Sequence, residues 1–320
     1  MTGKKFSHIP VLLKETIDFL AVRRGGTYVD ATLGLGGHSY EIARRIGREG
    51  MLIGFDKDPA ALELARKRLS EPPAELAGDW PAIRYEQGSF AQVGEKLEAS
   101  SVDGLMADLG VSSLQLEDAS RGFSFQAEGP LDMRMDPRAG MTAEQVVNRI
   151  DERTLADLIY EFGEERRSRR IARAIVRARP VRSTKQLVDV ISAAAPTMNR
   201  STTGKSGRRW APQKSQKGRT GEIHPATRTF QAIRIFVNRE LDDLKALLES
   251  APRVLKPGGR VAIISFHSLE DRIVKDALRD GAKEGIYEIL TKKPVIATEE
   301  EIDRNPRSRS AKLRAARKRE

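Results

Sequence analysis

The chain contains no cysteine, only four histidines and no long run of apolar residues. Without cysteine it can form neither a disulfide nor a thiolate metal site, which fits a reducing compartment, and so few histidines make a metal site improbable. A membrane helix needs about 18 consecutive apolar residues, and no such run exists. Lys14, Glu15 and Asp18 interrupt the apolar residues near the N-terminus, which argues against a signal peptide. We therefore expect a cytoplasmic protein without a membrane segment.

Positive charge is abundant but unevenly distributed along the 320 residues. Residues 197–221 hold seven basic side chains and no acid, and residues 304–320 hold eight basic side chains and one acid. These two segments together carry more than the whole net charge of +11. Clustered lysine and arginine side chains bind phosphate groups, so this pattern indicates a nucleic-acid partner. The alternative is a pair of solvated, disordered segments that only maintain solubility.

A glycine-rich turn lies between a short apolar strand at residues 28–30 and an amphipathic run that begins at Tyr40. The turn contains Gly34, Gly36 and Gly37, which would let a ligand approach the backbone at the start of a helix. Ser39 replaces the third glycine of a G-x-G-x-x-G pattern, so the turn alone is a weak signal for a nucleotide site. A plain connection between strand and helix explains it equally well.

Further strands are predicted at 51–55, 83–87 and 102–107, each separated from the next by a connecting segment. The connection after the second strand is a helix at 61–69, which Asp58 caps and Pro59 begins. This alternation predicts an α/β fold with a parallel, doubly wound sheet, in which ligands bind at the carboxyl ends of the strands. The four strands end at Asp30, Asp56, Phe90 and Asp108, so we expect these residues to share one edge.

The alternation breaks after Asp108. Residues 119–196 show helical patterns, capped at Thr142 and Asp151, and no convincing strand, which indicates an inserted helical domain. A long helix over 229–250 and a strand over 260–266 then return the chain to the sheet. We predict a first part of the sheet domain at 1–118, an inserted domain with a basic loop at 119–218, and a second part with a basic C-terminal tail at 219–320.

Two enzyme classes fit the glycine turn, a dinucleotide oxidoreductase and an S-adenosylmethionine-dependent methyltransferase. Asp56, 19 residues beyond Gly37, is where a ribose-binding carboxylate belongs in either class. Asp30 would be poorly placed beside a pyrophosphate and better placed near a cationic amine, which favours the methyltransferase. Phe90 could pack against an adenine ring, although a core position is nearly as good. An RNA-binding assembly factor is a third option, against which Asp56 and Asp108 argue.

Motifs along nearly the whole chain resemble those of a known protein family. They are His8-x-Pro10-Val11-Leu12-Leu13, Asp30-x-Thr32-x-Gly34-x-Gly36-Gly37-His38-Ser39, Asp56-x-Asp58-Pro59, Asp108-Leu109-Gly110-Val111-Ser112-Ser113-x-Gln115-Leu116, Arg121-Gly122-Phe123-Ser124-Phe125, Gly129-Pro130-Leu131-Asp132-Met133-Arg134, His224-Pro225-Ala226-Thr227-Arg228, Ser265-Phe266-His267-Ser268-Leu269-Glu270-Asp271 and Asn305-Pro306-Arg307-Ser308-Arg309-Ser310. With these motifs the chain resembles the RsmH (MraW) family of bacterial small-subunit ribosomal RNA cytosine-N4 methyltransferases.

The resemblance implies a Rossmann-like methyltransferase domain interrupted by an all-helical domain that recognises RNA. It implies S-adenosylmethionine as cofactor and methyl transfer to the exocyclic N4 of a cytidine in the decoding region of 16S ribosomal RNA, within the small ribosomal subunit. The implied cofactor contacts are Gly36, Gly37, His38, Asp56, Phe90, Asp108 and Gln115. Residues 199–221 are longer and more basic than the family pattern leads us to expect. The oligomeric state is open, and a homodimer is one option.

The chemistry also constrains the residues directly. An exocyclic amine is a poor nucleophile, so catalysis needs positioning and an acceptor for an amine N–H. Asp108 is the best-placed carboxylate, for cofactor binding first and amine orientation second. His267 either lines the substrate pocket or is satisfied locally at a helix start, and the backbone N–H of His38 matters more than its imidazole. Phe123 and Phe125 could stack an unpaired base, although core packing is slightly favoured.

Overall fold

The computed structural model describes residues 9–195 and 224–320, so the predicted basic loop at 197–221 lies outside the described residues. Contacts divide the chain into two units. The first comprises residues up to Glu117, Met135–Ala139 and Arg239–Glu320, and the second comprises Asp118–Arg134 and Gly140–Asn238. Within the described residues, no helix has both the length and the apolar character that crossing a membrane requires.

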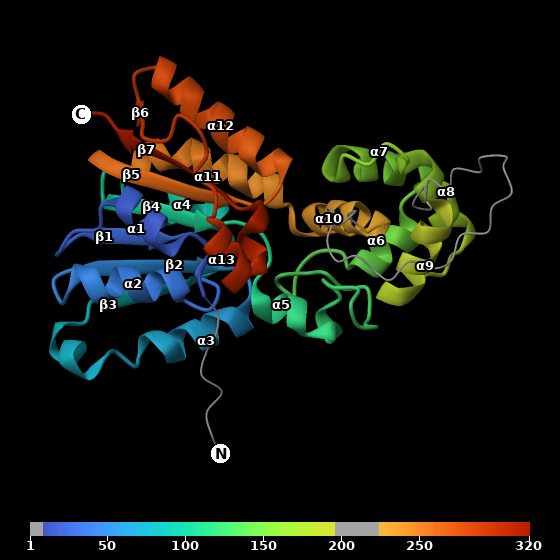
Figure 1. Cartoon of the computed structure of the whole chain (residues 1–320), viewed down its shortest axis with the longest axis horizontal. Coiled ribbons are helices and arrows are strands. Elements are labelled where there is room, and N and C mark those ends of the chain that lie inside the picture. The colour runs from blue at the N-terminus through green and yellow to red at the C-terminus, as the bar shows by residue number, and fades with distance from the viewer. Residues whose placement is uncertain (1–8, 196–223) are drawn as a thin grey trace, which may run out of the picture. The chain divides into compact units, whose positions relative to one another are not determined.

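The first unit is built on a seven-stranded sheet in the order β3-β2-β1-β4-β5-β7-β6 (Figure 1). Its strands are β1 Thr27–Asp30, β2 Met51–Asp56, β3 Ala82–Gln87, β4 Val102–Asp108, β5 Leu255–Ser265, β6 Tyr287–Ile289 and β7 Lys312–Lys318. Strands β1 to β5 pair in parallel, whereas β7 runs antiparallel to both of its neighbours. The predicted doubly wound α/β fold is confirmed, and the first four strands lie where the sequence pattern predicts them.

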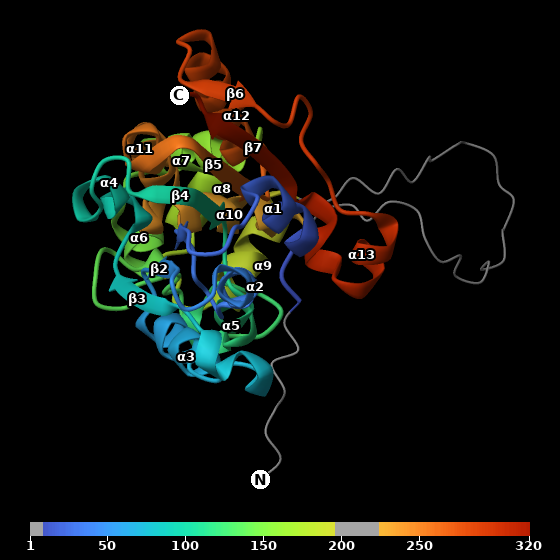
Figure 2. The same ribbon diagram turned by 90° about the vertical axis from the view of Figure 1, so that its left-hand side faces the viewer.

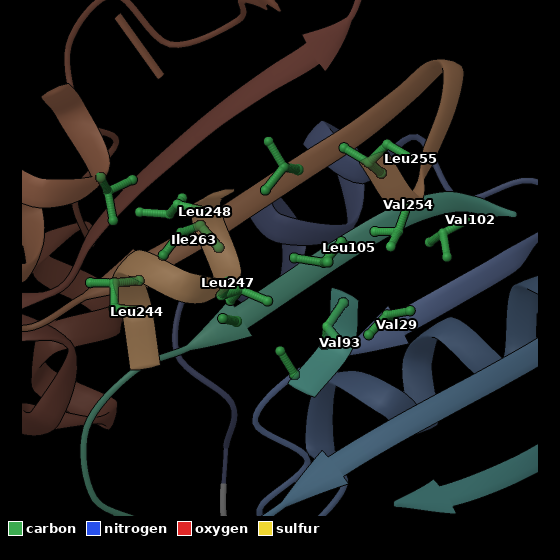
Figure 3. Close-up of a cluster of buried hydrophobic side chains, with 14 of the residues drawn as sticks. Val29, Val93, Val102, Leu105, Leu244, Leu247, Leu248, Val254, Leu255 and Ile263 are labelled. Carbon is green, nitrogen blue, oxygen red and sulfur yellow. The ribbon is translucent and has the colours of Figure 1, made fainter. Parts of the chain in front are cut away.

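Helices cover both faces of this sheet. One face packs against α1 Leu13–Leu20, α2 Gly37–Ile46 and α3 Pro59–Leu69, and the other against α4 Val93–Lys96, α11 Glu240–Val254 and α12 Ser268–Lys283. Successive strand residues point to opposite faces, so Leu105 packs with α11 while Met106 packs with the first helix layer. Figure 3 shows leucines of α11 lying against β4 and β5. Burial on both faces explains the nearly continuous apolar runs of these strands.

Shorter elements complete this unit. They are α5 Ser113–Glu117, α13 Glu299–Arg304 and the 3₁₀ turns Ala74–Asp79, Phe90–Gln92 and Pro306–Ser310. Asp58 caps α3 through the backbone N–H of Ala60, and Pro59 is the first helical residue, as predicted. The 3₁₀ turn Ala74–Asp79 lies between α3 and β3.

The expectation of a basic C-terminal tail is wrong for residues 312–318, because they form β7 inside the sheet. Ala315 and Ala316 are fully buried between the two helix layers. Arg314 is 8% exposed, and its Nε lies 2.6 Å from Oδ1 of Asp271 on α12. The sequence pattern does not predict this strand, because its buried apolar residues are mostly small and its charged residues suggest solvent exposure. A buried arginine is tolerated here because a carboxylate pairs with it.

The second unit is helical over its described residues. It contains α6 Ala143–Arg149, α7 Glu152–Gly163, α8 Ser168–Arg177, α9 Thr184–Ala194, α10 Pro225–Asn238 and the 3₁₀ turn Ala119–Arg121. The predicted caps are confirmed, since Thr142 forms a capping box on α6 and Asp151 caps α7. Phe123 is 7% exposed, and the ring of Phe125 lies 4.9 Å from that of Phe230. These contacts support core packing for both phenylalanines.

The single helix predicted over 229–250 is two helices, α10 and α11. Arg239 separates them with a left-handed backbone at φ 53°, and the side chain of Asn238 donates to the carbonyl oxygens of Met133 and Arg234. Apolar residues keep helical spacing across this break, so periodicity could not reveal it. Helix α10 packs on α7 and belongs to the second unit. The sequence-based boundary at 218/219 had assigned it to the sheet domain.

The position of β7 makes its apolar residues essential for stability. We expect Leu313→Ala, at a fully buried site, to lower the free energy of unfolding by about 2–5 kcal/mol, because it leaves a cavity in the core. Urea unfolding followed by circular dichroism measures this. Arg319→Ala, just beyond the strand and exposed, is the control and should change stability by less than about 0.5 kcal/mol. Equal stability of Leu313→Ala and the wild type would contradict the role of β7.

Candidate functional site

The strand order of the sheet reverses between β1 and β4, and doubly wound sheets bind ligands at this point. Asp30 ends β1 and Asp108 ends β4. Thr32 joins the two strand ends, because its N–H donates to Asp30 Oδ1 at 3.1 Å and its Oγ1 accepts from the Asp108 N–H at 2.6 Å. Asp30 is 1% exposed and also accepts from Ser39 Oγ at 2.7 Å. Two carboxylates therefore lie at the switch point, as the strand ends predict.

The electrostatics of this edge favour a positively charged ligand. Burial raises the pKa of Asp30 to about 6 and that of Asp56 to about 6. Burial, followed by the negative charges of Asp30 and Glu270, raises the pKa of Asp108 well above its usual range. Asp108 Oδ1 is buried and accepts no hydrogen bond from the residues that the structure describes. A bound cation would favour the charged forms of all these carboxylates.

The imidazole of His38 connects this acidic edge to the segment that precedes α1. Its Nε2 lies 2.9 Å from the carbonyl oxygen of Val11, which can only accept, so Nε2 carries the hydrogen. Its Nδ1 lies 3.8 Å from Asp108 Oδ2, and the side chain is 6% exposed. From the sequence alone we expect the backbone N–H of His38 to matter more than its imidazole. In the structure the buried ring itself lies between Val11 and Asp108.

Asp56 ends β2 on the same edge. Its Oδ2 accepts from the Gly34 N–H at 2.8 Å and its Oδ1 accepts from the Asp58 N–H at 2.8 Å. Each oxygen keeps a second lone pair, which could accept from a ribose hydroxyl. Gly34 has φ 51°, and the nearest atom to a Cβ there would be the carbonyl oxygen of Thr32 at 3.8 Å. Gly34 therefore positions the Asp56 carboxylate through its N–H, and its place in the glycine motif is the sequence signal for this role.

Gly36 and Gly37 have a packing explanation. A Cβ on Gly37 would lie 2.5 Å from Pro10 Cγ, so only glycine lets this proline approach. Gly36 precedes α2 with φ 72°, a left-handed conformation, and a Cβ there would touch Ala65 and Leu69 at 3.5 Å. Their predicted contacts with the cofactor stay predictions.

Gln115 and Phe90 lie near the same edge with protein partners of their own. Gln115 is 4% exposed, and its Nε2 donates to Asp58 Oδ2 at 3.0 Å. The amide therefore ties α5 to the cap of α3, two residues beyond Asp56. Phe90 follows β3, is partly buried and packs against the core. Their roles toward a cofactor stay predictions as well.

His267 caps α12, because its Nδ1 accepts from the Glu270 N–H. Its buried Nε2 lies 3.1 Å from Glu270 Oε1 but has no hydrogen bond within the described part of the chain, so both alternatives for His267 stay predictions. Among the described residues there is no group of three or more side chains suited to hold a metal ion.

A doubly wound sheet with an acidic edge for a cationic, hydroxyl-bearing ligand is the architecture expected of an S-adenosylmethionine-dependent methyltransferase. The chain belongs to the MraW methylase family, whose model matches residues 5–319. The resemblance drawn from the motifs is thereby confirmed, and S-adenosylmethionine is the cofactor. The side chains fit it, since the acidic edge suits its positive charges and Asp56 suits its ribose hydroxyls.

Relatives match over nearly their full lengths. A protein of Koribacter versatilis is 65% identical over 98% of this chain and 94% of its own. One of Acidobacterium capsulatum is 61% identical over 97% of this chain and 98% of its own, and one of Sorangium cellulosum is 49% identical over 97% and 90%. Each of the three is named "Ribosomal RNA small subunit methyltransferase H".

The raised pKa of Asp30 predicts an unusual pH dependence of stability in the absence of cofactor. The folded-state pKa of about 6 lies above the usual value of 3.8, so the folded protein binds more protons between these values. The stabilising effect is complete below pH 3.8 and is lost as pH rises through about 6. Only the last pH unit below the folded pKa lies between pH 5 and pH 7.5, so Asp30→Asn should gain about 1.4 kcal/mol relative to the wild type over this range.

Urea unfolding of both proteins at the two pH values measures this difference. Asp280→Asn, near the C-terminal end of α12 and half exposed, serves as the matched surface control. An unchanged difference between wild type and Asp30→Asn at pH 5 and 7.5 would contradict a raised pKa.

Proposed function

We propose that this chain transfers the methyl group of S-adenosylmethionine to the exocyclic N4 of a cytidine in the decoding region of 16S ribosomal RNA. The observation that carries the proposal is Asp108, whose buried Oδ1 lies at the switch point of the sheet without a hydrogen bond from the described residues. The names of the relatives support a small-subunit ribosomal RNA substrate. The N4 position and the decoding region follow from the motif resemblance. Such a substrate implies a cytoplasmic location.

S-adenosylmethionine supplies an activated methyl group. The N4 lone pair is delocalised into the pyrimidine ring, so the amine must be oriented and must lose a proton as it is methylated. Asp108 in its charged form accepts an N–H of the amine or binds the cofactor. A positive charge near Asp108 lowers its pKa and so restores this charged form. The buried ring of His38 lies beside Asp108, with Nδ1 3.8 Å from Oδ2, and limits the space open to that carboxylate.

The second unit offers a surface for the RNA backbone. Helix α8 exposes a series of arginines just before and along its length, namely Arg166, Arg167, Arg169, Arg170, Arg173 and Arg177. Arg173 pairs with Glu152 on α7 at 3.3 Å, whereas the helix buries Ile171 and Ile175 on its other side. An arginine-rich face of this kind binds phosphates through charge and directed N–H donors.

Tritium transfer from labelled S-adenosylmethionine to small ribosomal subunits that lack this modification tests the activity. We expect label on the N4 of one cytidine and about a 100-fold or greater loss of turnover for Asp108→Asn. Asp276→Asn, on the surface of α12, is the matched control and should keep full turnover.

Three results would contradict parts of the proposal. Full cofactor affinity together with full turnover of Asp108→Asn would rule out both roles of that residue. Label on a different nucleotide position would reject the N4 assignment. Binding of subunits without any methyl transfer would favour an assembly factor.

The arginine face of α8 predicts a salt-dependent effect. Arg170→Ala and Arg177→Ala should weaken binding to the ribosomal RNA and make the slope of log affinity against log salt shallower by roughly one per lost phosphate contact. Filter binding across a salt series measures the slope. Arg279→Ala, an ion-paired surface arginine of α12, is the control. Unchanged slopes for both α8 variants would exclude this face from RNA binding.

A further inference from the structure

A segment near the C-terminus holds the backbone just before α1. Glu301, on α13, accepts through Oε1 from the Leu12 N–H at 2.8 Å. Asn305, just beyond α13, donates through Nδ2 to the carbonyl oxygen of Ile9 at 3.0 Å. Figure 2 shows α13 beside α1, although the two are separated by almost the whole chain.

These two bonds fall on either side of the carbonyl group that His38 uses. Between Ile9 and Leu12, the Val11 carbonyl oxygen accepts from His38 Nε2, and Pro10 packs on Gly37. We call residues 9–12 the bracket. Its outer ends are held by α13 and Asn305, and its middle touches the start of α2.

The bracket includes a strained residue. Leu12 has φ 49° and ψ 37°, a left-handed conformation that costs a leucine roughly 1–2 kcal/mol. Such a conformation persists only where neighbouring groups determine it. Leu12 is fully buried and its N–H is bonded to Glu301, so Glu301 helps to fix the backbone at this point.

We propose that Glu301 and Asn305 are positioning residues for the methyl-donor site. They fix the bracket, the Val11 carbonyl group fixes the His38 ring, and the ring faces Asp108. The inference rests on the proposed role of Asp108 and His38 in cofactor binding and does not depend on which RNA is methylated.

Helix α13 has other attachments, so removing the Glu301 bond tests positioning rather than docking of the helix. Thr298 caps α13 through the Glu301 N–H, and Ile302 packs against the core beneath the helix. Arg307 donates to Ser113 Oγ on α5. None of these contacts uses the Glu301 carboxylate.

Isothermal titration of S-adenosylhomocysteine into the full-length protein tests the proposal. We expect Glu301→Ala to raise Kd about tenfold, because it leaves the Leu12 N–H without its acceptor. Glu301→Gln keeps a side-chain carbonyl oxygen and should bind within about twofold of the wild type. Asn305→Asp removes the donor to Ile9 and should also weaken binding. Glu300→Ala, on the exposed side of α13, is the matched control and should bind normally.

A double-mutant cycle with His38→Ala separates positioning from general stabilisation. In the His38→Ala background, Glu301→Ala should have no further effect on Kd, because the series of contacts from Glu301 through Val11 and His38 to Asp108 is already interrupted. A lower melting temperature with unchanged Kd would overturn the proposal, since Glu301 would then be only a structural tether. Equal weakening in both backgrounds would overturn it too, because the effect would bypass His38.

Asp108→Asn distinguishes failure of this inference from failure of the proposed site. If Asp108→Asn binds weakly while Glu301→Ala and Asn305→Asp bind normally, only the positioning role is rejected. If Asp108→Asn binds like the wild type, the role of Asp108 in cofactor binding is rejected. The positioning of Asp108 by Glu301 is then rejected with it.

Discussion

The accumulation of carboxylates, one fully and two partly buried, at one sheet edge is the constraint on which the site depends. Parallel strands deliver their carboxyl ends to one place, and here Asp30, Asp56 and Asp108 arrive together. Buried negative charges are unfavourable unless donors satisfy them. The turns that follow the strands supply such donors from the backbone, as Gly34 and Asp58 do for Asp56. A cationic methyl donor bound at this edge would relieve the remaining unfavourable charge.

Much of this arrangement could be predicted from the sequence, because it follows from local rules. Strand ends marked by acidic residues share an edge whenever the strands are parallel, which places Asp30, Asp56 and Asp108 correctly relative to one another. Helix caps are equally local, and Asp58 and Thr142 cap the helices that follow them. The family motifs extended this prediction to the cofactor.

What could not be predicted depends on contacts between distant segments. The basic stretch at 312–318 looks solvated in the sequence, but it forms an internal strand in which Arg314 pairs with Asp271. The left-handed backbone of Arg239 ends a helix where apolar spacing continues. The glycine at position 37 is explained by the close approach of Pro10, 27 residues earlier in the chain, rather than by the turn itself.

The internal place of β7 has a consequence for synthesis of the protein. β7 follows every other strand along the chain, yet it lies between β5 and β6. During translation β6 therefore has no neighbour to pair with until β7 has left the ribosome, and the α13 contacts to the bracket form only shortly before. The earlier strands can pair first, so a nascent chain passes through a stage in which β5 is an open, aggregation-prone edge.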